Sequence, residues 1–381
     1  MPELDGLRGV AILSIIVYHY FVQPLEVVPG SFVAYGQKYF SILWLGVDIF
    51  FVLSGFLLGG ILLDQRNATN LFSVFYTRRF LRIVPPYLLL LIALLVVTVW
   101  VNHTQPIGTD WLMGKPFPPW AFVLYIQNFF MAAAGQFGGN FAAITWSLAI
   151  EEQFYLLFPL IIYFCPPSKL ARVLLIAVIS APLIRLGLLF GLPRGEVASC
   201  VLLPARWDSL AAGALAALCQ QDPNASAWIY RRQQLLLCGL ALMWVTIALF
   251  PFLGFGQLSF PTIAIGYSWI AIASALLILL LQTRRLHLIA SFLRNRLLRF
   301  FGRVSYMLYL VHSAVLGLMF LLLFRRGPAI ASPLDLGVVC GALIVSICLA
   351  ASTWYLFEKR LIQLGHRFAY RNSTVLKLAP Q

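Results

Sequence analysis

Residues 3–21 read ELDGLRGVAILSIIVYHYF, an apolar segment with an arginine near its start and a histidine deep inside it. Arg8 and His19 are eleven positions apart. In an α-helix this spacing returns the second side chain to within roughly 20° of the first, about 16 Å along the axis. A histidine at that depth in a membrane is costly and normally faces a partner or a water-filled cavity. One helix face is therefore expected to link a membrane surface with the membrane interior.

The composition predicts the class of protein. Hydrophobic residues make up 61% of the 381 residues, and the mean hydropathy is +0.89, which is more than a soluble chain of this length buries. We therefore expect an all-α polytopic membrane protein whose first segment stays in place as a helix instead of being cleaved as a signal. The six cysteines lie in or beside apolar segments without metal-ligand spacing, so no metal site is expected.

Ten apolar segments are long enough to cross a membrane. They lie near residues 8–24, 41–63, 83–101, 144–164, 171–192, 200–219, 234–252, 259–281, 303–324 and 334–357. An eleventh candidate, residues 120–134, is short and is interrupted by Gln127 and Asn128, which favours a re-entrant or interfacial segment. The ten helices are expected to form one domain, residues 1–362, followed by a frayed polar cytoplasmic tail, residues 363–381.

The distribution of positive charge predicts the orientation. With ten spans, most of the 27 Lys and Arg residues fall on the side of the N-terminus. The positive-inside rule then places both termini in the cytoplasm, whereas an eleventh span at 120–134 would move most of the downstream charge outside. Because topology explains the net charge of +14, no nucleic-acid partner is expected.

Polar residues inside the predicted spans cluster in depth. Two histidines and several carboxylates fall near one level of the bundle, and two arginines and an aspartate lie in its outer half: His19, Asp48, Glu151, Glu152 and His312, then Arg185, Arg206 and Asp208. Isolated charges there cost several kcal/mol each, so these groups must pair or line a wet cavity. Taken alone, His312 or Asp48 is as readily a satisfied core residue as a functional one.

A cluster of arginines is expected at the cytoplasmic end of the bundle. It comprises Arg8, Arg78, Arg79 and Arg82. Arginine suits bidentate phosphate binding, so a cytosolic polyphosphate ligand is one interpretation, and a purely topogenic role is the other. Prolines 85 and 86 are expected in the first turn of the third span. The glycines of LSGFLLGGILL, residues 53–63, are expected to permit close helix packing.

Seven motifs in fixed order give the chain a family resemblance. They are LDGLRGVAILSIIVYH, GVDIFFVLSGFLLG, FYTRRFLRIVPPY, TWSLAIEEQFYLLFP, ARWDSLAAGALAA, GRVSYMLYLVH and WYLFEKR. With them the chain resembles the membrane-bound acyltransferase 3 family, whose members acylate sugars and other hydroxyl-bearing acceptors. The resemblance implies a ten-helix core in a bacterial inner membrane. It also implies that His19 is the essential histidine, Arg8 the motif arginine and Glu151 the motif carboxylate.

The resemblance further implies a donor site and a mechanism. Acyl-CoA, by default acetyl-CoA, would bind from the cytosol with its phosphates on Arg8, Arg78, Arg79 and Arg82. His19, oriented by Glu151 or Asp48, would act as general base or as transient acyl carrier. The acceptor would be a carbohydrate or another alcohol at the extracytoplasmic side. The residues expected to bind it or to stabilise the developing oxyanion are Arg185, Arg206, Asp208, Tyr309 and His312. Membrane lipids surround the protein, and a separate extracytoplasmic transferase is a further expected partner.

A proton-coupled transporter is the competing hypothesis. In that class of protein His19, His312, Asp48 and Glu151 would form a proton relay, and Arg206 would bind an anionic substrate. The two hypotheses differ in whether the chain recognises acyl-CoA.

Overall fold

The ten predicted spans are present in the computed structural model, which describes residues 1–281 and 286–371. Ten helices in this part of the chain are long and apolar enough to cross a membrane, and no β-strand occurs in it. The spans run over Pro2–Val22, Phe32–Asp64, Leu71–Thr104, Thr145–Phe164, Pro167–Gly191, Gly195–Gln221, Gln233–Leu253, Thr262–Leu280, Arg296–Phe324 and Pro333–His366. The prediction of an all-α polytopic membrane protein is confirmed.

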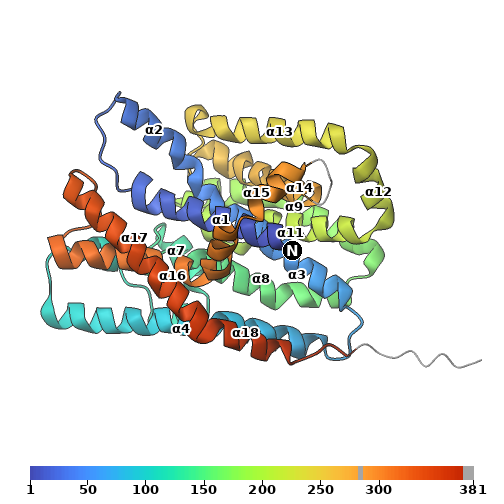
Figure 1. The fold of residues 1–381 in the computed structure, drawn as a ribbon, viewed down its shortest axis with the longest axis horizontal. Helices are drawn as coiled ribbons and strands as arrows, with labels where there is room; N and C mark the ends of the chain where they lie inside the picture. Colours follow the sequence, from blue (N-terminus) through green and yellow to red (C-terminus); the bar gives the residue numbers. More distant parts are fainter. Residues whose placement is uncertain (282–285, 372–381) are drawn as a thin grey trace, which may run out of the picture.

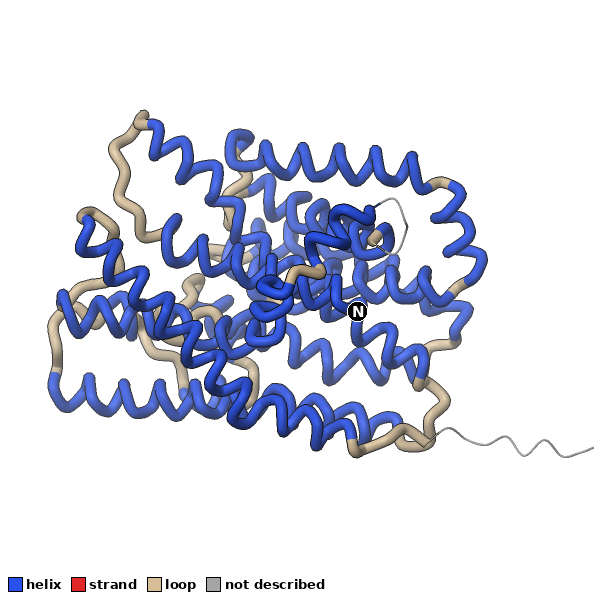
Figure 2. The backbone as a smooth tube through the Cα atoms, viewed as in Figure 1, coloured by secondary structure: helices blue, strands red, loops and turns tan. Residues whose placement is uncertain are grey.

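The helices lie roughly side by side in one bundle (Figures 1 and 2). The long ones are α1 (Pro2–Val17), α3 (Gly46–Asp64), α4 (Leu71–Thr104), α8 (Thr145–Phe164), α9 (Pro167–Gly191), α11 (Leu203–Gln221), α13 (Gln233–Leu249), α14 (Tyr267–Leu280), α16 (Arg296–Phe324) and α17 (Pro333–Thr353). Shorter helices connect or extend them: α2 (Phe32–Phe40), α5 (Asp110–Met113), α6 (Pro119–Val123), α7 (Gln127–Ala134), α10 (Gly195–Val201), α12 (Pro223–Arg231), α15 (His287–Leu293) and α18 (Lys359–His366).

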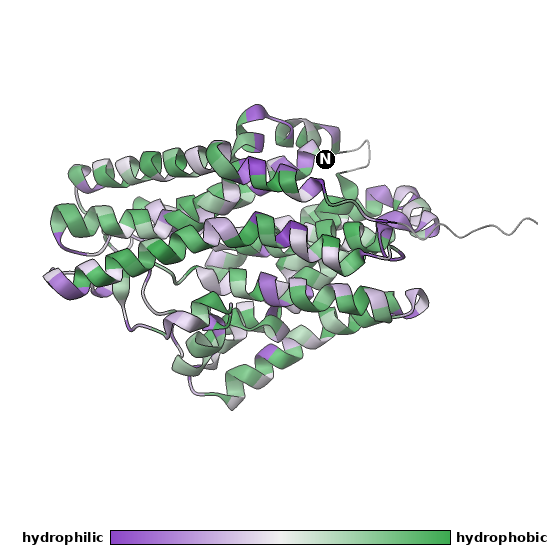
Figure 3. Ribbon diagram, turned by 90° about the horizontal axis from the view of Figure 1, so that it is seen from below, coloured by the Kyte–Doolittle hydropathy of each residue, from purple (hydrophilic) through white to green (hydrophobic). Residues whose placement is uncertain are grey.

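Burial divides the bundle into central and peripheral helices. In the spans that contain α3 and α11, 67% of the most apolar stretch is buried inside the protein. The corresponding share is 22% for α4 and 17% for α9. The peripheral helices expose large apolar side chains outward, which is expected where lipid replaces water. Figure 3 shows apolar residues along the lengths of the helices, with hydrophilic residues mainly near the connections. A few hydrophilic positions lie inside, and these carry the candidate chemistry.

Small residues allow α3 and α11 to approach closely at the centre. A Cβ atom added at Gly55 would lie 1.9 Å from the carbonyl oxygen of Leu210, and one added at Gly213 would lie 2.0 Å from that of Val52. Membrane helices pack through such contacts because lipid provides no hydrophobic drive for their association. The expected packing role of the SGF glycine is confirmed, and the contact holds Asp48 and Arg206 in neighbouring helices.

We expect Gly55→Ala to destabilise the protein by about 1–3 kcal/mol, because the added methyl group meets backbone that cannot move aside. Gly60→Ala is the matched control, since a Cβ at Gly60 has no atom within 4 Å. Thermal unfolding of both variants in detergent tests this. Equal midpoints for the two variants would contradict the packing argument.

The third span begins earlier than expected. Helix α4 starts at Leu71, so Pro85 and Pro86 lie inside it and not in its first turn. Residues 71–82 therefore extend the helix beyond the predicted apolar segment, which begins at residue 83. This extension places Arg78, Arg79 and Arg82 at helical spacings of three and four, where side chains share one face.

Residues 120–134 do not form an eleventh span among the described residues. They fold as α6 and α7, with Tyr125 between them at a φ of 55°. Gln127 and Asn128 are fully buried and donate hydrogen bonds to the carbonyl oxygens of Thr145 (2.9 Å) and Val201 (3.0 Å). The polar side chains that interrupt the apolar pattern therefore anchor this segment to α8 and α10.

The expectation of a frayed tail after residue 362 is wrong for residues 363–371. Helix α18 continues to His366 alongside α4 (Figure 1). The chain after it is tied to the start of α4 by two hydrogen bonds to the side chain of Asn70. Its Nδ2 donates to the carbonyl oxygen of Ala369 (2.9 Å), and the amide of Arg371 donates to its Oδ1 (2.8 Å). The remainder of the predicted tail, residues 372–381, lies outside the described residues.

Candidate active site

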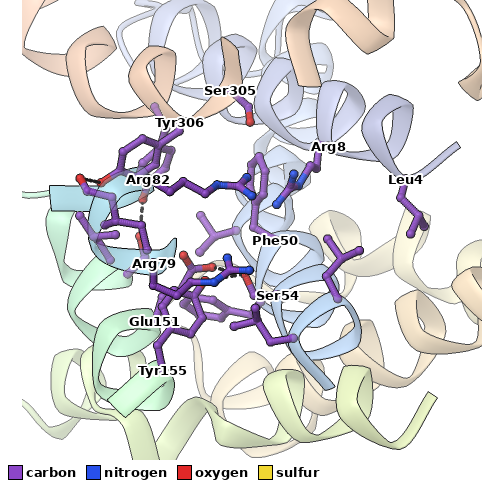
Figure 4. A pocket seen from close by; sticks show the side chains of 18 of the residues that line it. Leu4, Arg8, Phe50, Ser54, Arg79, Arg82, Glu151, Tyr155, Ser305 and Tyr306 are labelled. Carbon is purple, nitrogen blue, oxygen red and sulfur yellow. Dashed lines mark hydrogen bonds between the residues drawn. The ribbon is translucent and has the colours of Figure 1, made fainter. Parts of the chain in front are cut away.

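A cavity of about 250 Å³ opens between α1, α3, α4, α8 and α16 (Figure 4). One end is lined by Met1, Asp5 and Arg8 of the N-terminal helix. The other end reaches Ser147 of α8 and Tyr309 of α16. The cavity therefore runs from the N-terminal end of α1 toward the interior of the bundle. Arg8 is the last residue of α1 that lines it, and its deeper part lies between α3, α8 and α16.

Three arginines point into this cavity without a carboxylate partner. Arg8 comes from α1, and Arg79 and Arg82 come from α4 (Figure 4). Within residues 1–281 and 286–371, the ion pairs closer than 4 Å are Arg185–Asp208, Arg206–Asp48, Arg294–Glu3 and Arg326–Asp335. Asp5 and Glu151 line the same cavity, but neither forms an ion pair closer than 4 Å with these arginines. The guanidinium groups can therefore bind phosphate or carboxylate ligands.

Arg78 lies next to these arginines but is already engaged. Its Nη2 and Nε donate to the carbonyl oxygen of Phe368 at 2.6 and 3.1 Å, and its guanidinium carbon lies 4.9 Å from the centre of the Tyr370 ring. It lines a second, smaller cavity and not the main one. The structure therefore separates Arg78 from the three arginines with which the sequence grouped it.

Glu151 projects into the main cavity, whereas Glu152 does not line it. The Ser54 hydroxyl donates to Glu151 Oε1 at 2.7 Å and lies 2.9 Å from the hydroxyl of Tyr155 (Figure 4). Sequence reasoning selected Glu151 over Glu152 but missed Ser54 and Tyr155. Tyr155 follows Glu151 by four residues, and that spacing signals a shared helix face.

His19 is paired with His312. It lies in a π-helical turn, Tyr18–Val22, a feature that is frequent at functional sites. Its Nδ1 is 3.1 Å from Nε2 of His312, and Nδ1 of His312 is 2.6 Å from the carbonyl oxygen of Tyr309. Tyr20 secures the same turn by donating to the carbonyl oxygen of His312 at 2.8 Å.

The carbonyl of Tyr309 fixes the tautomers of both rings. A carbonyl only accepts, so Nδ1 of His312 carries the hydrogen, and Nε2 of a neutral His312 is then an acceptor. Nδ1 of His19 must donate to it, which leaves Nε2 of His19 with a free lone pair. His312 is fully buried with both nitrogens engaged, while His19 is partly accessible.

The histidine pair lies just beyond the inner end of the main cavity. Tyr309 lines that end, and its hydroxyl is 2.6 Å from the Ser147 hydroxyl. The ring centres of Tyr309 and His312 are 5.7 Å apart, and those of His312 and His19 are 5.0 Å apart. A ligand that fills the cavity therefore reaches Tyr309, which is one ring contact from His312 and two from His19.

Asp48 does not orient His19, contrary to expectation. It forms an ion pair with Arg206, and both side chains are about 1% exposed. Arg185 pairs with Asp208 at 2.8 Å, also in full burial, and donates to the carbonyl oxygens of Ile263 (2.6 Å) and Ala205 (2.8 Å). None of these four side chains lines the main cavity.

The pairing of these four charges has a physical reason. A buried ion offsets its desolvation cost only when an opposite charge is close at hand, and α3, α9 and α11 supply these opposite charges to one another. Arg185, Arg206 and Asp208, which were expected to meet the substrate, are therefore engaged in buried ion pairs outside the main cavity, and Asp48 pairs with Arg206 and not with His19. Of the residues assigned to the substrate, Tyr309 is the one that the structure brings to the main cavity.

We expect Asp48→Ala to lower the free energy of unfolding by about 3–5 kcal/mol, because it strands the Arg206 guanidinium in a dry interior. Asp48→Ala combined with Arg206→Met should recover much of this loss. Glu3→Ala is the control, since its partner Arg294 is 60% exposed and such pairs contribute roughly 0–1 kcal/mol. Thermal midpoints of the purified variants test the prediction. A single variant no less stable than the double variant would contradict it.

Comparison with known proteins identifies the family of the chain. The acyltransferase 3 family model, described as an acyltransferase domain, matches residues 1–354. The chain is 33% identical over 196 residues to the O-acetyltransferase OatA of Staphylococcus aureus strain NCTC 8325, a match that covers 50% of this chain and 29% of that protein.

A second relative is a putative O-acetyltransferase of S. aureus strain MSSA476, 34% identical over 169 residues, which cover 42% of this chain and 24% of the relative. The matches thus cover less than a third of the length of these relatives. No solved structure matches the chain. Because the family model extends over nearly the whole chain, including every residue of the cavity described above, the protein belongs to the acyltransferase 3 family.

Proposed function

We propose that the protein transfers an acetyl group from cytosolic acetyl-CoA to a hydroxyl group of a glycan or similar acceptor at the extracytoplasmic side. The observation that carries this proposal is the main cavity, which extends from three arginines without a close carboxylate partner to Tyr309. The ring of Tyr309 neighbours that of His312, which in turn pairs with His19. The names of the two relatives, an O-acetyltransferase and a putative O-acetyltransferase, support the choice of acetyl. The proposed setting is a bacterial inner membrane with both termini in the cytoplasm, which the charge distribution favours.

Arg8, Arg79 and Arg82 hold the donor in this proposal. Their guanidinium groups bind the phosphates of acetyl-CoA by charge-assisted hydrogen bonds, and the pantetheine arm follows α1 inward. The thioester then lies near Tyr309 and Ser147, whose hydroxyl groups donate to the oxyanion as it forms. Glu151, held by Ser54, lies along this path and not in contact with His19.

His19 carries out the proton transfer. Its Nε2 lone pair takes the proton of the acceptor hydroxyl while the oxygen attacks the thioester carbonyl. The carbon–sulfur bond breaks, an ester forms, and the imidazolium returns the proton to the departing thiolate. In the alternative route Nε2 attacks the thioester itself, the carbon–sulfur bond breaks, and CoA leaves as the thiolate. The acceptor hydroxyl then takes the acetyl group from Nε2, and the proton it gives up balances the charge of the thiolate. Both routes require the tautomer that His312 imposes.

The function is tested by an acetyl-transfer assay with the purified protein in proteoliposomes. Radiolabelled acetyl-CoA is placed inside the vesicles and glycan acceptors outside. We expect label to reach the acceptor as an alkali-labile ester. Transfer by the purified chain alone would mean that no separate extracytoplasmic transferase is needed. Mass spectrometry of envelope glycans from cells with and without the protein would identify the acceptor. Indifference to acetyl-CoA together with pH-driven solute uptake would instead support the transporter.

A further inference from the structure

A second cavity, of about 150 Å³, lies against the face of α4 that carries the arginines. Arg78, Arg79 and Arg82 line it from α4, while His366 and Tyr370 line it from the C-terminal segment. Arg79 and Arg82 also line the main cavity. The two cavities therefore meet at the same pair of guanidinium groups.

The C-terminal segment is a fixed wall of this second cavity. Its backbone is held at three points along the start of α4, because Thr69 binds the carbonyl of Arg371, Asn70 that of Ala369, and Arg78 that of Phe368. Residues 355–371 lie beyond the part of the chain that matches the family model. The wall is thus a feature of this chain that the family assignment does not account for.

The lining of the second cavity combines positive charge with flat rings. Two guanidinium groups without carboxylate partners, Arg79 and Arg82, stand beside the phenol of Tyr370 and the imidazole of His366. Guanidinium groups bind phosphates, and aromatic rings stack on nucleobases. A group that carries both, a phosphorylated nucleoside, matches this combination better than an inorganic anion or an apolar ligand does.

We propose that the second cavity binds the adenine nucleotide end of the acyl-CoA donor. Tyr370 and His366 pack against the base, and Arg79 and Arg82 hold the phosphates at the junction of the two cavities. Arg78 is a positioning residue, because it binds the Phe368 carbonyl and the Tyr370 ring. The inference rests on the proposed use of acyl-CoA and adds the part of the donor that the main cavity leaves outside.

The inference is tested by measuring the equilibrium binding of three ligands to the whole chain in nanodiscs. The ligands are acetyl-CoA, acetylpantetheine, which lacks the nucleotide, and ATP. Tyr370→Ala should raise the Kd of acetyl-CoA about tenfold and leave that of acetylpantetheine unchanged. Tyr370→Phe keeps the ring and should bind acetyl-CoA as the parent protein does. Phe368→Ala is the matched control, since its ring is 45% exposed and only its carbonyl is used.

Each other outcome overturns the inference in a recognisable way. If the parent protein binds acetyl-CoA but Tyr370→Ala binds it equally well, the nucleotide lies elsewhere and the proposed function stands. If Tyr370→Ala weakens both ligands alike, the segment only supports the fold. If it weakens ATP but not acetyl-CoA, the second cavity serves a free nucleotide. A parent protein that binds no acetyl-CoA would end both proposals.

Discussion

His19→Ala should lose acetyl transfer by about a thousandfold while still binding acetyl-CoA. A positioned general base contributes about 10²–10⁴ in rate, and a nucleophilic carrier cannot be replaced by alanine at all. Donor affinity is expected to persist because the guanidinium groups of the main cavity lie near its opposite end. Initial rates and acetyl-CoA binding of the purified variant give the two measurements.

His103→Ala serves as the control, since this exposed histidine near the end of α4 lies outside the main cavity. A His19→Ala enzyme that retained more than about a tenth of the parent rate would refute the proposed role. The base and carrier routes can then be separated in the parent protein, because only the carrier route releases CoA before acceptor is added.

Replacing Arg79 and Arg82 together by glutamine should abolish the thermal stabilisation that acetyl-CoA gives. Hydrogen bonds to charged groups contribute about 1.5–3 kcal/mol each, so losing two raises the Kd on the order of a hundredfold or more. Stabilisation by a ligand scales with its concentration relative to Kd, and it would vanish at concentrations that saturate the parent protein. Melting curves across an acetyl-CoA titration measure this.

Arg303→Gln is the matched control for charge, because this arginine on α16 is exposed and lines neither cavity. Undiminished stabilisation of the double variant by acetyl-CoA would show that these arginines only determine topology. This is the alternative that the sequence left open for the whole cluster, and the absence of carboxylate partners in the described part of the chain now favours a ligand.

The number of spans could be predicted because the bilayer restricts the possibilities so strongly. The length of each apolar segment must match the thickness of the hydrocarbon core, and backbone groups without hydrogen-bond partners are excluded from lipid. The ten segments could therefore be predicted from their hydropathy and length. The start of α4 was missed because Ser73, Thr77 and three arginines interrupt the apolar pattern before Pro85, although the helix continues through them. The order of residues 363–371 was missed for a similar reason, since it depends on contacts with Asn70 and Arg78.

The site was only partly predictable because its partners are far apart in the chain. Helical spacing placed Arg8 and His19 on one face, and the motif pointed to Glu151. The sequence could not reveal that His312, 293 positions away, binds the ring of His19, or that Asp48 forms an ion pair with Arg206. Depth along the membrane normal was enough to group these charges, but the direction in which each side chain points depends on helix packing.

The two buried ion pairs have a consequence for how the protein enters the membrane. Helix α11, with α10, forms the least apolar of the ten spans and carries both Arg206 and Asp208. Alone in lipid, it would bear two uncompensated ions. Its neutralising groups are on α9, immediately upstream, and on α3, made much earlier. Stable integration of this span during biogenesis should therefore be cooperative, with the earlier helices retained beside the insertion machinery until α11 arrives.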